Sequence, residues 1–123
     1  MITEQELKKS VIACEQYIRD LEHQKQRDKR DTASLHDLTS AIQETRIKLQ
    51  VLHYTEGLTG MISEEELKHG IQKLTKRIEE LEIPQEIDLF NGDKGKKIQT
   101  ELSVLKTRLF TLQFVAGREK TLL

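Results

Sequence analysis

Apolar residues recur along this chain at alternating steps of four and three, a spacing that places them on one face of an α-helix. Strands would instead alternate at every second residue. Four such stripes occur, with threonine or cysteine at single positions: Leu7, Val11, Cys14, Ile18 and Leu21; Leu35, Leu38, Ile42, Thr45, Leu49 and Leu52; Leu67, Ile71, Leu74, Ile78 and Leu81; Ile98, Leu102, Leu105, Leu109 and Leu112. The pattern predicts an all-α fold with helices near residues 3–29, 35–56, 63–83 and 96–116.

The stripes come in two pairs because the sequence repeats itself. Residues 1–57 align with residues 61–117 at a constant offset of 60 without a gap, and thirteen of the aligned pairs are identical. A chain of 123 residues has room for one domain with one modest core. We therefore expect a single helical domain over residues 1–123, built from two helical hairpins at residues 1–60 and 61–120.

Both copies carry the same signals for where helices begin and end. A Ser/Thr-x-x-Glu capping box opens each copy, formed by Thr3 with Glu6 and by Ser63 with Glu66. A glycine ends each copy, where a left-handed residue is favoured after a helix; these glycines are Gly57 and Gly117.

The short connection from Gly57 to Met61 favours antiparallel packing of the two hairpins. We expect a pseudo-two-fold, antiparallel four-helix bundle, although exchange of hairpins between two chains is an alternative that the sequence leaves open. The second and fourth helices are apolar over a wider arc than the first and third. Because an inner helix has two neighbours, the wider arc predicts that the second and fourth helices lie at the centre.

The fourth helix and the residues after it carry an excess of large apolar side chains. A contiguous exposed apolar patch would mark an interface with a partner or with a second copy. The alternative is that these side chains fill the core. The residues concerned are Phe110, Phe114, Val115, Leu122 and Leu123.

The segment between the third and fourth stripes, residues 84–97, differs most between the copies. We expect Pro84 to stop the third helix and Asn91-Gly92 to form a tight turn. The N-terminus of a helix favours anions. Lysines and an aromatic residue near the expected start of the fourth helix therefore predict that the segment binds an anionic, nucleotide-like ligand. A turn that only caps the bundle is the alternative. The candidate ligand-binding residues are Phe90, Asn91, Lys94, Lys96 and Lys97.

The composition and the absence of known motifs limit which partners and activities we expect. The net charge of −1 gives no global basic field, so nucleic acid is not an expected partner. The four histidines form no metal-binding motif, and Cys14 occupies a stripe position that suits a buried small hydrophobe. No catalytic motif occurs, so we expect neither enzyme activity nor a cofactor or metal. With no signal peptide and no apolar run near 18 residues, we expect a cytoplasmic location without membrane insertion.

These patterns favour a non-enzymatic helical interaction protein, an adaptor or inhibitor that acts through protein–protein contacts and self-associates as a homo-oligomer. The alternative is a protein that binds or sequesters a small anionic ligand through residues 84–97.

Overall fold

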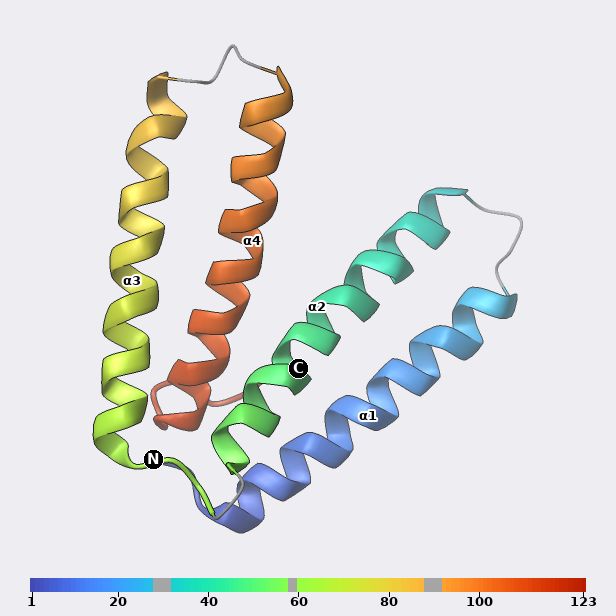
Figure 1. The fold of residues 1–123 in the computed structure, drawn as a ribbon. Coiled ribbons are helices and arrows are strands. Elements are labelled where there is room, and N and C mark those ends of the chain that lie inside the picture. Colours follow the sequence, from blue (N-terminus) through green and yellow to red (C-terminus); the bar gives the residue numbers. More distant parts are fainter. Residues whose placement is uncertain (28–31, 58–59, 88–91) are drawn as a thin grey trace.

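The residues that the structure describes form four helices, shown in Figure 1. The computed structural model describes residues 1–27, 32–57, 60–87 and 92–123, and describes side chains outside residues 28–32, 58–59 and 83–95. The helices are α1 (Glu4–Arg27), α2 (Thr32–Glu56), α3 (Glu64–Ile87) and α4 (Gly92–Val115). No strand occurs among the described residues, so the prediction of an all-α, four-helix fold is confirmed.

The helices pair as two hairpins that meet along one side of each. α1 packs along α2 and α3 packs along α4, while the principal contact between the hairpins joins α2 to α4. The prediction that the second and fourth helices lie at the centre is therefore confirmed. Figure 1 shows that the hairpins are joined at the end where the chain links them and diverge toward their tips, so the four helices form an open V.

The core follows this shape. One main cluster at the closed end of the V draws on all four helices and on the residues that follow α4. Its buried members are Leu7, Val11, Cys14, Val51, Leu52, Leu67, Ile71, Leu112, Val115 and Leu122. Each arm then has its own small cluster, around Ile42 in the α1–α2 hairpin and around Leu102 in the α3–α4 hairpin. The closed end therefore holds the hairpins together, and each arm is stabilised by its own stripe pairing.

The predicted capping hydroxyls are in place at both hairpin starts. The amide of Glu6 donates to Thr3 Oγ1 at 3.1 Å, and the amide of Glu66 donates to Ser63 Oγ at 3.2 Å. Each hydroxyl accepts from an amide that has no partner within its own helix, and such a cap contributes about 1 kcal/mol to stability.

The predicted terminal glycines are also confirmed. Gly57 has φ 67° and Gly117 has φ 83°, both in the left-handed region that side chains disfavour. The amide of each glycine donates to the carbonyl three residues earlier, at 3.2 Å from Gly57 to Tyr54 and at 3.0 Å from Gly117 to Phe114.

Among the described residues, two backbone hydrogen bonds cross from one hairpin to the other. The amide of Ile2 donates to the carbonyl of Val115 at 2.8 Å, and the amide of Ile62 donates to the carbonyl of Thr55 at 3.0 Å. The start of each hairpin is thereby attached to the last helix of the other, which explains why the closed end is the tightly connected end.

Exposed ion pairs join the two helices within each hairpin at matching positions. Arg46 contacts Glu22 at 3.0 Å, and Lys106 contacts Glu82 at 3.4 Å. Exposed pairs of this kind contribute about 0–1 kcal/mol each, so they fix helix register more than they stabilise the fold.

Two predictions about the segment between α3 and α4 were wrong. Pro84 does not stop α3, which continues to Ile87, and Gly92 does not lie in a turn but begins α4. Proline removes the hydrogen bond to the carbonyl four residues earlier and crowds that carbonyl, but Pro84 stands in the last turn of α3, so little helix follows it. One glycine costs about 0.5–1 kcal/mol relative to alanine in a helix, which does not prevent α4 from beginning at Gly92. Asn91 lies outside the described residues.

Candidate functional site

A groove of about 560 Å³ lies between α2, α3 and α4 near the closed end of the V. We call it the open groove. Its lining residues are Gln50, Val51, Tyr54, Gly70, Lys73, Leu74, Arg77, Arg108 and Leu112. A cavity of about 380 Å³ beside Met1 is smaller and is lined by several exposed charged side chains, so it offers less apolar surface to a partner.

The floor of the open groove is apolar because it is the outer surface of the core. Val51 and Leu112 belong to the main cluster, and Leu74 is half-buried against it. Gly70 widens the groove: a Cβ placed there would lie 3.4 Å from Leu112 Cδ1, so the missing side chain leaves space next to that leucine. The groove therefore offers aliphatic surface that a partner's side chain can bury.

Tyr54 forms one wall of the open groove and is 65% exposed. It lies near the C-terminal end of α2. Tyrosine is enriched at protein interfaces because its ring buries a large area while the hydroxyl keeps a hydrogen-bond partner. An exposed tyrosine beside an apolar floor is thus a typical anchor for a bound segment.

Three cations surround the floor: Lys73 and Arg77 from α3, and Arg108 from α4. Arg77 is paired with Glu80 at 3.6 Å and with Glu101 at 3.4 Å. Lys73 and Arg108 form no ion pair with any side chain that the structure describes. The groove is consequently a local positive site on a chain whose net charge is −1.

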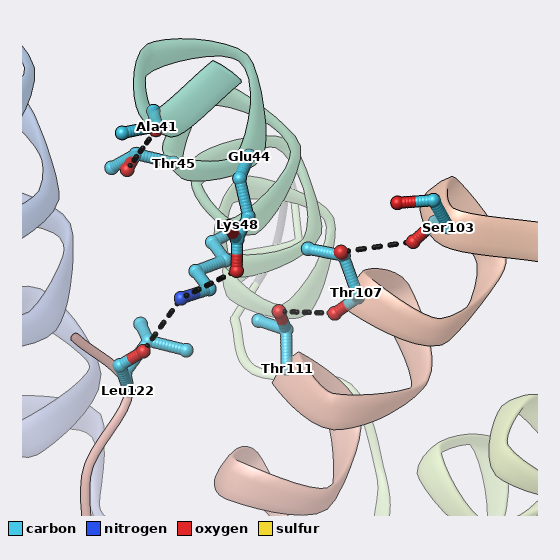
Figure 2. Close-up of polar contacts among 8 residues, drawn as sticks. All are labelled: Ala41, Glu44, Thr45, Lys48, Ser103, Thr107, Thr111 and Leu122. Carbon is cyan, nitrogen blue, oxygen red and sulfur yellow. Dashed lines mark hydrogen bonds and ion pairs between the residues drawn. The ribbon is translucent and has the colours of Figure 1, made fainter. Parts of the chain in front are cut away.

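On the other side of the molecule, the residues after α4 are fixed by a buried lysine. Leu122 is only 6% exposed and belongs to the main cluster. Lys48 on α2 is 8% exposed; its Nζ donates to the carbonyl oxygen of Leu122 at 2.8 Å and lies 3.5 Å from Glu44. Figure 2 shows this amino group between Glu44 and Leu122. It also lies 5.5 Å from the ring centre of Phe110, close enough for a cation–π contact.

Cys14 lies in the same region of the core and is fully buried. Burial raises the pKa of the Cys14 thiol, while the positive charge of Lys48 opposes the rise. A neutral, inaccessible thiol is a poor nucleophile. The prediction that Cys14 serves as a small hydrophobe in the core is confirmed by this burial.

Buried threonine hydroxyls are satisfied within their own helices. Thr45 Oγ1 donates to the carbonyl of Ala41 at 2.7 Å, and Thr111 Oγ1 donates to the carbonyl of Thr107 at 2.8 Å (Figure 2). A threonine can therefore occupy a core stripe without an unpaired hydroxyl, as the sequence pattern predicted for Thr45.

The residues predicted to bind an anionic ligand are only partly within the described structure. Phe90 and Asn91 lie outside the described residues, and so does the side chain of Lys94. Lys96 and Lys97 are exposed near the start of α4. No described contact brings them to a common site, so this binding site stays a prediction.

The five residues predicted as a protein interface divide between core and surface. Val115 and Leu122 are buried in the single chain, and Phe110 and Phe114 are half-buried against the main cluster. Leu123 is 51% exposed. Most of this apolar excess therefore fills the core, which is the alternative that the sequence left open, and an interface at these residues stays a prediction.

Sequence reasoning missed the open groove, although comparison of the two copies held a signal for it. Lys73 and Arg77 stand where the first copy has Ala13 and Tyr17, so two cations were present in one copy alone. A search restricted to the loop between α3 and α4 could not find them, because they lie in the middle of a regular helix.

Within the described ranges, no group of three or more His, Cys, Asp and Glu side chains could hold a metal ion. Nor does any helix in that part of the chain have the length and apolar character needed to cross a membrane. Comparison of the chain with known protein families, curated proteins and solved structures gives no match.

Proposed function

We propose that this protein is a non-enzymatic adaptor that binds a segment of another protein in the open groove. The observation that carries the proposal is the combination of an apolar floor with two cations, Lys73 and Arg108, that form no described ion pair. Tyr54 adds an exposed aromatic wall to the same site.

The size and lining of the groove favour a peptide segment. Pockets that bind small molecules or side chains have volumes of roughly 300–1,000 Å³, so the groove accommodates a few side chains but not a folded domain. Burying one leucine or isoleucine of a partner contributes about 1.5–3 kcal/mol. The cations attract carboxylates, which raises the association rate and selects among partners.

The lining also supports binding over catalysis. The described lining residues include no carboxylate, histidine, cysteine or serine, so histidine and carboxylate, the commonest general bases, do not line the groove. Lysine and arginine side chains at the rim can hold an anionic group in place.

We infer, as part of this proposal, that the two hairpins are copies of one unit related by a pseudo-two-fold axis. The sequence offset of 60 supports this relation, because it also relates the crossed hydrogen bonds: Ile2 to Val115 becomes Ile62 to Thr55. The same offset relates the Glu22–Arg46 ion pair to the Glu82–Lys106 pair. A pair of equivalent grooves follows from this relation.

Selection of random twelve-residue peptides on the immobilised full-length chain tests the proposed function. We expect recovered peptides to combine aliphatic and acidic residues, and to bind Arg108→Glu at least tenfold more weakly. Lys9→Glu reverses the same charge at an exposed position outside the groove and should bind them normally. Failure to recover any peptide, or equal binding to all three proteins, would contradict the proposal.

Two further expectations from the sequence belong to this proposal. Self-association is tested by sedimentation equilibrium across a hundredfold range of concentration, where a constant monomer mass would refute it. The anionic-ligand alternative rests on residues 84–97, and a thermal-shift panel of nucleotides tests it, because a ligand that binds the native state raises the unfolding temperature.

A further inference from the structure

We propose, resting on the function proposed above, that the open groove takes a non-helical partner segment with one buried aliphatic side chain flanked by acidic residues. The chain's own residues 118–123, here called the tail, provide the template for this mode of binding. Leu122 of the tail lies in the groove that corresponds to the open groove in the other half of the molecule.

The corresponding groove is found by moving each lining residue by 60 positions. The pairs are Gln50 with Phe110, Val51 with Thr111, Tyr54 with Phe114, Gly70 with Ser10, Lys73 with Ala13, Leu74 with Cys14, Arg77 with Tyr17, Arg108 with Lys48, and Leu112 with Leu52. The open groove lies between α2, α3 and α4, and its counterpart lies between α4, α1 and α2.

One residue of the tail, Leu122, lies in the counterpart groove. It belongs to the same cluster as Cys14 and Leu52, and Phe110 packs against that cluster. Figure 1 shows the tail running from the end of α4 toward α2, and a hydrogen bond from Lys48 attaches Leu122 to α2. The tail is not helical, since α4 ends at Val115. A non-helical segment with one buried leucine is therefore a suitable occupant of this kind of groove.

The backbone of the occupant is recognised as well as its side chain. Lys48 Nζ donates to the carbonyl oxygen of Leu122 at 2.8 Å, as Figure 2 shows. Arg108 has the place of Lys48 in the open groove. A guanidinium at this place can donate to a partner's carbonyl or carboxylate oxygen in the same way.

Charge distinguishes the two grooves and defines the partner. Lys48 is already paired with Glu44, whereas the residue 60 positions after Glu44 is the apolar Val104. Arg108 therefore lacks the neighbouring carboxylate that Lys48 has. Lys73 and Arg77 further replace uncharged residues of the counterpart. Because the open groove has this excess of positive charge, its occupant should carry carboxylates of its own.

The tail itself does not meet this requirement. It contains Arg118 and Lys120 with only one acidic side chain, Glu119. The tail of a second copy would bring cations to a cationic rim, so charge complementarity favours an acidic segment of a different protein over a second copy of this chain.

The test uses a labelled peptide that converts the tail into the expected partner. The tail with its preceding glycine reads Gly-Arg-Glu-Lys-Thr-Leu-Leu. The probe is fluorescein-labelled Gly-Asp-Glu-Glu-Thr-Leu-Leu with an amidated C-terminus, titrated against the full-length chain by fluorescence anisotropy. We expect saturable binding, a loss of at least tenfold in affinity with Arg108→Glu, and unchanged affinity with Lys9→Glu. Replacing the first leucine of the probe by alanine should also weaken binding at least tenfold.

An amide spectrum of the isotope-labelled protein locates the probe. Gly70 lines the open groove, so we expect its amide resonance to shift on binding, while the resonances of Leu122 and Leu123 stay unchanged. Movement of the tail resonances with an unshifted Gly70 would mean that the probe displaces the tail, and would overturn the inference. A dimer of wild-type chains that Arg108→Glu dissociates would also overturn it, since a second copy would then cover the groove.

The outcomes also separate this inference from the proposed function. If selected peptides bind the open groove but the tail-derived probe does not, the proposed adaptor function still stands. The inference that the partner segment binds as the tail does would then be wrong. If neither selected peptides nor the probe bind, the proposed function fails as well.

Discussion

Replacement of Leu122 by alanine tests whether the tail is an integral part of the core. Leu122 is 6% exposed, and the neighbouring Leu123, which is 51% exposed, supplies a matched control with the same side chain. Leucine-to-alanine changes in protein cores cost about 2–5 kcal/mol. The hydrogen bond from Lys48 is unaffected by the change, because Leu122 accepts it through its backbone carbonyl.

The cost should lie at the low end of that range. A tail can leave its groove, so the substitution cannot cost more than the free energy with which the whole tail docks. We therefore expect Leu122→Ala to lower the free energy of unfolding by about 2 kcal/mol, and Leu123→Ala to change it by less than about 0.5 kcal/mol.

Urea unfolding followed by far-ultraviolet circular dichroism measures both variants. With a denaturant dependence of about 2 kcal/mol per molar for a protein of this size, the Leu122→Ala midpoint should fall by about 1 M. Similar midpoints for the two variants would refute the reasoning, because they would mean that the tail contributes no specific burial at Leu122. The groove comparison that rests on the tail would then lose its template.

Four further substitutions test other parts of the structure. Alanine at Gly57 or Gly117 places a side chain at a positive φ, which costs about 1–2 kcal/mol of stability. Gly57→Ala should cost more than Gly117→Ala, because its Cβ would clash with the carbonyl oxygen of Gly60. Equal midpoints of the two variants in thermal unfolding would contradict this expectation. Gly70→Ala should raise stability by about 0.5–1 kcal/mol, because its Cβ meets Leu112 at an ordinary contact distance of 3.4 Å in mid-helix. Burial raises the pKa of the Cys14 thiol above its ordinary value of 9.0, so in alkaline solution the native state keeps a proton that the unfolded chain releases. The free energy of unfolding should therefore be constant below about pH 9 and should fall as the pH rises above it. Urea midpoints at about pH 8 and about pH 10 should therefore differ more for the wild-type chain than for Cys14→Ala, and identical pH dependence would contradict the burial of the thiol.

The sequence predicted the helices well because their signals are local. Capping hydroxyls such as Thr3 and Ser63 act within one turn, and the stripes state which face of each helix is buried. Helix ends near Pro84 and Gly92 were predicted less well, because the rest of a helix can offset the cost of one proline or glycine at its end.

The open V and the groove could not be predicted because they depend on how two similar hairpins meet. Lys48 illustrates the difficulty, because a lysine on a helix is usually solvated. Its burial here depends on Glu44, on the ring of Phe110 and on the carbonyl of Leu122, which lies 74 residues away in the sequence. Nothing in the sequence marks Arg108 as a functional residue. It stands 60 positions after Lys48, and this equivalence matters because Lys48 binds the tail in the counterpart groove.

The most direct test of the groove as a protein-binding site is an intermolecular nuclear Overhauser measurement on the complex of the full-length chain with the acidic probe peptide. We predict contacts between the methyl groups of the probe's first leucine and those of Leu74 and Leu112 on the groove floor. Contacts to Leu52 instead, the residue that stands in the counterpart groove where Leu112 stands in the open groove, would contradict the account.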